Sequence, residues 1–167
     1  MQWWDGYRAV YGAELRAAAR EFGDHGWPAT VTPGGLLLVT GTTLDVLEMP
    51  AEVGRYVCAR LRAAGLVVPV AATPMATWWF PVIAGSAPSA SGRADVDVHT
   101  GGEVVLAPPS ERPDGWVHWR VSPALCGWEL PPATVILTAA ADAPRVGLDV
   151  APGAQRPAAG VAVVMRS

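Results

Sequence analysis

The 167-residue sequence contains no lysine and no asparagine, so all 12 of its basic residues are arginines. Codons for both missing residues are AT-rich, and their absence indicates a high-GC genome. The 15 acidic residues outnumber the basic ones and give a formal net charge of -3. Non-specific nucleic-acid binding depends on a basic excess that neutralises phosphates. The overall charge therefore does not favour nucleic acid as a partner, although a chain with this net charge can still carry a local basic patch.

Cysteine is scarce, and long apolar runs are missing. Cys58 and Cys126 form no CxxC pair, so they predict no zinc site, and we expect free thiols in a reducing, cytoplasmic compartment. The N-terminus lacks the basic and apolar regions of a secretory signal. Runs such as residues 36–39 are far shorter than the roughly 20 residues that span a bilayer. We therefore expect no membrane partner.

Hydrophobic residues make up 51% of the chain and charged residues 16%, which predicts a packed globule rather than a disordered chain. The length suits a single domain, which we place at residues 1–143, followed by a Pro/Ala/Gly-rich segment at 144–167. Apolar periodicity predicts helices at 3–22, 50–64 and 131–141. Apolar runs predict strands at 36–40, 44–49, 66–72, 76–83, 95–99, 103–107 and 116–121. This order predicts an α+β fold with mostly antiparallel strands packed on helices, and a mobile loop at 84–94.

Two acidic side chains and a histidine occupy alternate positions of one predicted strand. Asp95, Asp97 and His99 therefore share a face. They form either a small metal or ligand site or a polar edge that faces solvent. Because three ligands on one strand are spread along it, a metal site there needs a contribution from another element.

An aromatic run, Trp78-Trp79-Phe80, falls on a predicted central strand, where alternation sends Trp79 to the face opposite its two neighbours. One of these faces belongs to the core, and the other is either covered by helices or open for stacking of a flat ligand. Ser110 and Arg112 lie near His118 in the sequence, which could suggest a nucleophile and a base. However, the GxSxG turn of a serine hydrolase is absent, and the prolines at 108–109 already explain the turn before Ser110. We keep Ser110 and Arg112 as ligand-binding candidates and do not favour a hydrolase.

Three segments together resemble one protein family. They are Gly26-Trp27-Pro28 with the helix before it and Val39-Thr40-Gly41 after it, Asp45–Pro50 running on to Gly54 and Leu61, and the order Val96–His99, Gly101-Gly102, Val104–Ser110 and Gly115–Trp119. This arrangement is similar to the N-terminal domain of bifunctional DNA primase/polymerases, the prim-pol domain. The resemblance covers about residues 15–140.

The resemblance implies an RRM-like sheet and a nucleotidyl transferase that makes and extends primers with two Mg²⁺ or Mn²⁺ ions. Two cations that clamp the attacking and leaving oxygens need carboxylate ligands. In the family an Asp-x-Asp pair ends the strand before the helix, a histidine follows on the next strand, and a third Asp lies on a later strand. The working surface is the open face of the sheet.

The sequence departs from this pattern where the metal ligands belong. If Pro50 and Gly54 fix the register, the Asp-x-Asp positions are Leu47 and Met49, which cannot bind a hard cation. The family histidine falls near Thr77 or Trp78, and only the third acid remains, as Asp97. Asp45 and Glu48 are near the lost pair, but their spacing places them on opposite faces of a strand.

We therefore predict a catalytically degenerate prim-pol-like protein without polymerase activity or a cofactor. It would bind a protein partner or a small ligand or nucleotide in the remnant cleft, which we expect to be less anionic and more aromatic than in the family. The candidate ligand-binding residues are Trp78, Trp79, Asp95, Asp97, His99, Ser110 and Arg112. Two alternatives stay open. One is an active metal-dependent primase/polymerase that uses Asp45, Glu48, Asp95 and Asp97 with Mg²⁺ or Mn²⁺, and the other is an enzyme with unrelated chemistry in the same cleft.

Overall fold

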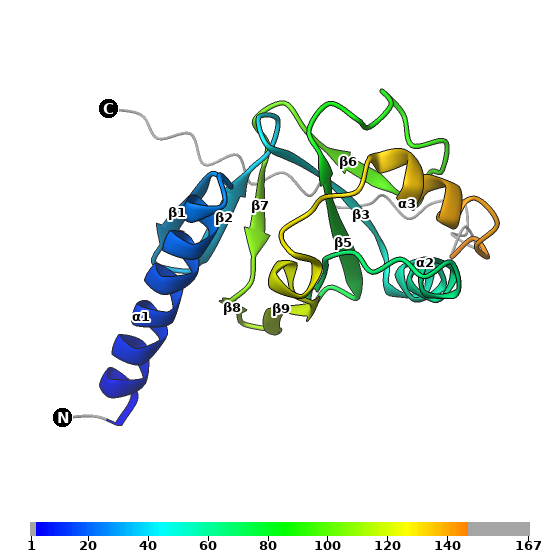
Figure 1. Cartoon of the computed structure of the whole chain (residues 1–167). Coiled ribbons are helices and arrows are strands. Elements are labelled where there is room, and N and C mark those ends of the chain that lie inside the picture. Colours follow the sequence, from blue (N-terminus) through cyan, green and yellow to red (C-terminus); the bar gives the residue numbers. More distant parts are fainter. Residues whose placement is uncertain (1–2, 147–167) are drawn as a thin grey trace, which may run out of the picture.

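The structure, a computed structural model, describes residues 3–146, with side chains from residue 12 onward. Its helices are α1 (Trp3–Asp24), α2 (Ala51–Ala63) and α3 (Ala133–Ala140), with a 3-10 turn η1 (Pro123–Cys126) (Figure 1). The strands are β1 (Ala29–Thr32), β2 (Gly35–Val39), β3 (Leu44–Pro50), β4 (Val70–Ala72), β5 (Thr77–Ile83), β6 (Asp97–His99), β7 (Val104–Ala107), β8 (Ser110–Arg112) and β9 (Gly115–Val121).

The strands form two antiparallel sheets. A three-stranded sheet has the order β1-β2-β7, and a six-stranded sheet has the order β6-β3-β5-β4-β9-β8. Every strand pair is antiparallel. The prediction of an α+β domain with antiparallel strands packed on helices is therefore confirmed.

Two hydrophobic cores lie on the two faces of the six-stranded sheet. On the helix face, Leu47 and Met49 of β3 and Phe80 of β5 pack against α2 and α3. On the opposite face, Val46 and Trp79 pack with residues of β2, β7 and the end of α1. Because side chains alternate along β3, the helix face takes residues 45, 47 and 49, and the opposite face takes 44, 46 and 48.

Helix α2 lies very close to the sheet at Gly54. A Cβ atom on Gly54 would be only 2.7 Å from Cε3 of Trp78. The Trp78 ring is in turn flanked by two guanidinium groups, with Arg55 at 5.7 Å and Arg120 at 4.8 Å from its centroid. The glycine thus lets the helix backbone rest on the indole, which explains its place four residues after the proline that ends β3.

Some predicted elements differ from the structure. The predicted strand at 66–72 is shortened to β4 and the one at 95–99 to β6, and β8 was not predicted. The loop at 84–94, which we expected to be mobile, is held at several points: Gly85 N donates to Asp45, Ala133 N donates to Ser86, and Arg93 binds the end of α3. Most of the predicted C-terminal segment, residues 147–167, lies outside the described residues. No helix within residues 3–146 has the length and apolar character to cross a bilayer.

Candidate functional site

Polar side chains gather where the face opposite the helices is not covered by the small sheet. Glu48 of β3 lies directly across from Asp97 of β6, and His99 is two positions further along that strand. Thr77 of β5 reaches the same place from the other side of β3. We call this group, Glu48, Thr77, Asp97 and His99, the polar corner.

A chain of hydrogen bonds crosses the polar corner. Thr77 Oγ1 donates to Glu48 Oε1 at 2.6 Å, and Thr77 in turn pairs with Thr73 Oγ1 at 2.7 Å. The other oxygen of Glu48, Oε2, lies 2.7 Å from His99 Nε2. The second ring nitrogen of His99, Nδ1, lies 3.1 Å from Oε2 of Glu103. Both oxygens of Glu48 and both nitrogens of His99 are therefore engaged.

This geometry favours the charged forms of both partners. The hydrogen bond to Glu48 raises the pKa of His99; burial opposes this, and the carboxylate charges of Glu48 and Glu103 support it. Burial by itself would raise the pKa of Glu48, but hydrogen bonds from His99 and Thr77 and the imidazolium charge lower it below its usual value. An imidazolium held between two carboxylates is the resulting state at mildly acidic pH.

Asp97 is the unengaged acid of the polar corner. Its side chain is exposed and makes no hydrogen bond or ion pair with any residue that the structure describes. Together with Glu48, Thr77 and Asp95 it lines a hollow of about 160 Å³. A carboxylate without a partner beside a small hollow can accept hydrogen bonds from a ligand or attract a positive charge.

Asp95, predicted to share a ligand face with Asp97, is engaged elsewhere. It precedes β6, and its two oxygens accept hydrogen bonds from Nε and Nη2 of Arg93 at 2.8 and 2.7 Å. Arg93 also donates to the carbonyls of Ala140 and Ala143, so it ties the loop before β6 to the end of α3. The Arg93 guanidinium lowers the pKa of Asp95. Asp95 is therefore primarily part of a structural ion pair.

The aromatic candidates are buried. Trp78 is 7% exposed on the helix face, and Trp79 is 2% exposed on the opposite face, where it packs edge-on against Trp119. Neither ring offers an open face for a base to stack on. The two tryptophans therefore do not line an open aromatic cleft, and the polar corner includes the carboxylates of Glu48 and Asp97.

The remaining candidates lie away from the polar corner. Asp45 is buried at the helix face and accepts a hydrogen bond from Gly85 N. Ser110 is fully buried; its hydroxyl donates to Ala107 O and accepts from Leu36 N, so it fastens β8 to the three-stranded sheet. Arg112 is exposed, 3.9 Å from Asp114. The structure therefore brings together Glu48, Asp97 and His99 and leaves these three residues apart.

The residues of β3 do not fit a pair of divalent cations. Leu47 and Met49, the positions assigned to the acid pair, lie in the core beneath α2. On the face that carries Asp97, the corresponding alternate positions are Val46 and Glu48, and both oxygens of Glu48 are already bound. Among residues 3–146, no group of three or more His, Cys, Asp or Glu side chains is arranged to hold a metal ion. The side chains on β3 therefore do not supply the ligands that a two-metal reaction requires.

The family model named "Bifunctional DNA primase/polymerase, N-terminal" matches residues 2–146. The chain belongs to this family. Comparison with curated proteins gives no match, and neither does comparison with solved structures. The prim-pol model thus spans the whole described part of the chain, including both sheets and the polar corner.

The sequence analysis gave Glu48 too little weight, named Thr77 only as a possible position of the family histidine, and did not identify Glu103. The alternation of side chains along β3 could have identified Glu48. An apolar i, i+2 pair just before a helix, here Leu47 and Met49, is typical of the face that the helix covers, so the side chain between them points to the opposite face. Thr77 carries no signal of this kind, since it reaches Glu48 only through the register of β5 against β3. Glu103 follows β6 and reaches His99 across the turn between β6 and β7.

Proposed function

We propose that this prim-pol family member has lost metal-dependent polymerase chemistry and acts by binding a small ligand in the polar corner. The observation that carries the proposal is the pair of side chains that β3 presents beside Asp97, on the face of the sheet opposite the helices. These are an apolar residue, Val46, and a glutamate, Glu48, whose two oxygens are held by Thr77 and His99. Asp97 is left as the one available carboxylate of the polar corner.

The chemistry of the polar corner favours a ligand that presents hydrogen-bond donors or a positive charge. Asp97 supplies the available acceptor, Glu48 lies directly across from it with both oxygens bound, and the nearby arginine, Arg93, is already bound to Asp95. A triphosphate without metal would meet the carboxylates of Glu48 and Asp97, because the cation beside them, the His99 imidazolium, is already held between Glu48 and Glu103. A nucleoside, through the amino groups of its base, or an organic amine is the better match.

An active metal-dependent polymerase is the second candidate, and one observation favours it. Glu48 and Asp97 lie directly opposite each other on neighbouring strands, beside a histidine. Displacement of Thr77 and His99 from Glu48 would give two carboxylates close enough to share one cation.

Titration of the full chain with a nucleoside, a diamine and a metal-free nucleoside triphosphate tests the proposal. We expect the nucleoside or the diamine to bind more tightly than the triphosphate, and Asp97→Asn to weaken that binding about tenfold. Glu111→Gln, at an exposed acid of β8 outside the polar corner, is the matched control and should bind as the unaltered chain does. Binding of the triphosphate alone, unaffected by Asp97→Asn, would contradict the proposal.

A further inference from the structure

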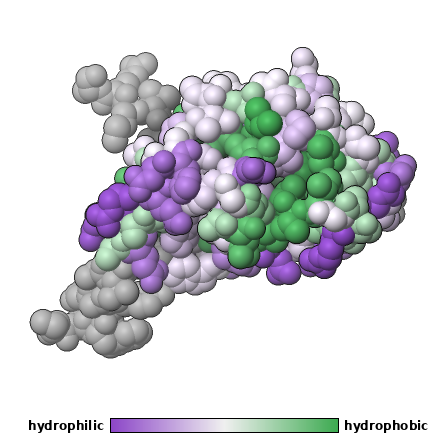
Figure 2. All heavy atoms as spheres, viewed as in Figure 1, coloured by the Kyte–Doolittle hydropathy of each residue, from purple (hydrophilic) through white to green (hydrophobic). Residues whose placement is uncertain are grey.

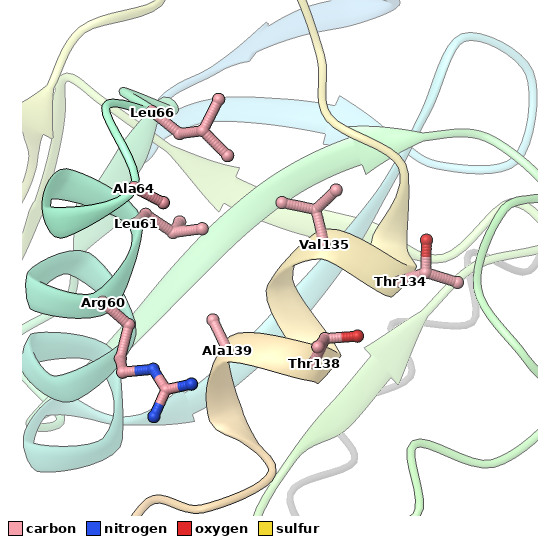
Figure 3. Close-up of a pocket in the computed structure, with 8 residues that line it drawn as sticks. All are labelled: Arg60, Leu61, Ala64, Leu66, Thr134, Val135, Thr138 and Ala139. Atoms are coloured by element: carbon pink, nitrogen blue, oxygen red, sulfur yellow. The ribbon is translucent and has the colours of Figure 1, made fainter.

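The C-terminal end of α2 carries an apolar surface on the side of the sheet away from the polar corner. An open groove of about 350 Å³ runs between α2 and α3, and Leu61, Leu66, Val135 and Ala139 point into it (Figure 3). A smaller hollow on the other flank of α2 shares Leu61 and Leu66 and reaches β9. The apolar surface therefore wraps around the end of the helix.

Two side chains of this surface are well exposed. Leu66 is 47% and Val67 is 62% accessible to solvent, in the segment that follows the C-terminal cap of α2. Figure 2 shows an almost continuous hydrophobic region across this side of the molecule, where Figure 1 places α3, η1 and the end of α2. Contiguous exposed apolar surface of this kind marks interaction sites more often than scattered single residues do.

Arginines border the apolar surface without matching acids. Arg55 and Arg62 lie on one flank of α2 and Arg120 on the adjoining strand β9, and none of the three forms an ion pair within the described residues. Burial raises the pKa of the Cys58 thiol, and the charges of two of these arginines, Arg62 and Arg120, act to lower it. Arg60, on the flank toward α3, has a single acidic partner, Asp142, at 3.6 Å.

We propose that this α2 surface, made of Leu61, Leu66, Val67 and Val135 with Arg55, Arg62 and Arg120, docks an acidic amphipathic helix of a partner protein. The groove accepts apolar side chains spaced one helical turn apart, and the arginines pair with carboxylates on the flanks of that helix. The apolar centre distinguishes the surface from a nucleic-acid site, since protein–DNA interfaces are more polar and more positive than protein–protein interfaces. The proposal is independent of the ligand in the polar corner.

Fluorescence anisotropy with three synthetic peptides tests the docking surface on the full chain. The first peptide has Leu at i, i+3, i+4 and i+7 and Glu on both flanks; the second replaces Glu by Lys, and the third replaces Leu by Ser. We expect the first to bind and the other two to bind at least about tenfold more weakly. Equal binding of the Glu and Lys peptides would overturn the proposal.

Paired variants locate the binding. Arg62→Glu should weaken the acidic peptide about tenfold, whereas Arg20→Glu on α1 should not. Leu66→Ser should weaken it similarly, whereas Val104→Ser, at an equally exposed position of β7, should not. If Leu66→Ser lowers the melting temperature, Val67→Ser replaces it. Equal effects of a variant and its control would overturn the assignment.

Three further arms exclude other occupants. Asp97→Asn should leave peptide binding unchanged, so that failure at the polar corner and failure at the α2 surface are told apart. A single-stranded oligonucleotide is tested as a competitor. If it displaces the peptide and its own binding is weakened by Arg62→Glu, the proposal is overturned and the surface is assigned as a nucleic-acid site. A cross-link from position 138 to residues 147–167 of the same chain would also overturn it, because the chain would then occupy its own groove.

Discussion

Replacement of Gly54 by alanine tests how α2 is positioned over the sheet, since two effects of opposite sign meet there. Alanine is favoured over glycine inside a helix by about 1 kcal/mol. The new methyl group, however, would lie 2.7 Å from Cε3 and 3.0 Å from Cβ of Trp78. Real Cβ atoms do not approach neighbours so closely, so the helix or the indole must move.

Movement of the indole is restricted, and we therefore expect Gly54→Ala to destabilise the protein. Trp78 is buried, lies in the core with Val53 and Phe80, and has Arg55 and Arg120 against its ring. Overpacking of a filled core costs about 1–3 kcal/mol, and at this distance we expect the upper part of that range. The net loss is then about 1–2 kcal/mol, equivalent to a fall of roughly 3–6 °C in melting temperature.

Urea denaturation of Gly54→Ala measures this loss directly, and Gly12→Ala is the matched control. In α1 the nearest atom to a Cβ on Gly12 is the flexible end of Arg16, at 3.4 Å. Gly12→Ala should therefore gain up to about 1 kcal/mol from helix propensity alone. If both variants are stabilised equally, α2 does not rest on Trp78 as described and the reasoning is wrong.

Two further predictions concern the ion pairs near the polar corner. His99→Gln should lower stability by about 1 kcal/mol between pH 5 and 6.5. Because the pKa of His99 is raised and that of Glu48 is lowered, this loss should shrink as the pH rises through the folded pKa of His99 or falls through that of Glu48; a loss constant from pH 4 to 9 would contradict the pairing. Arg93→Met, which leaves Asp95 nearly buried without its partner, should cost about 3 kcal/mol on denaturation, whereas Arg112→Met should cost less than about 0.5 kcal/mol. Equal losses would show that Arg93 does not fasten the loop to α3.

The fold was predictable where its helices and strands follow a local pattern in the sequence. The apolar stripe of α2 and the continuous run of β3 identified both elements to within a residue or two. Residues 84–94 carry no such pattern, and their attachment depends on Arg93 reaching carbonyls about 50 positions away. Long-range contacts of one side chain leave no periodic signal, so we took this segment for a mobile loop.

The site was predictable only in part. Asp97 and His99 were placed correctly on one face of a strand, because alternation is a local property. The opposite partner, Glu48, depends on how β6 registers against β3. The burial of Trp78 and Trp79 on both faces depends on which elements cover the sheet, and an aromatic run by itself fits a stacking surface as well as a core.

Incorporation of a labelled nucleotide into a primed template, with Mg²⁺ or Mn²⁺, tests the central claim most directly. With an apolar residue at Val46 and both oxygens of Glu48 engaged, we predict no incorporation by the full chain at any concentration of either metal. Metal-dependent incorporation that is abolished by Asp97→Ala would contradict the claim, because Glu48 and Asp97 would then hold the catalytic cations.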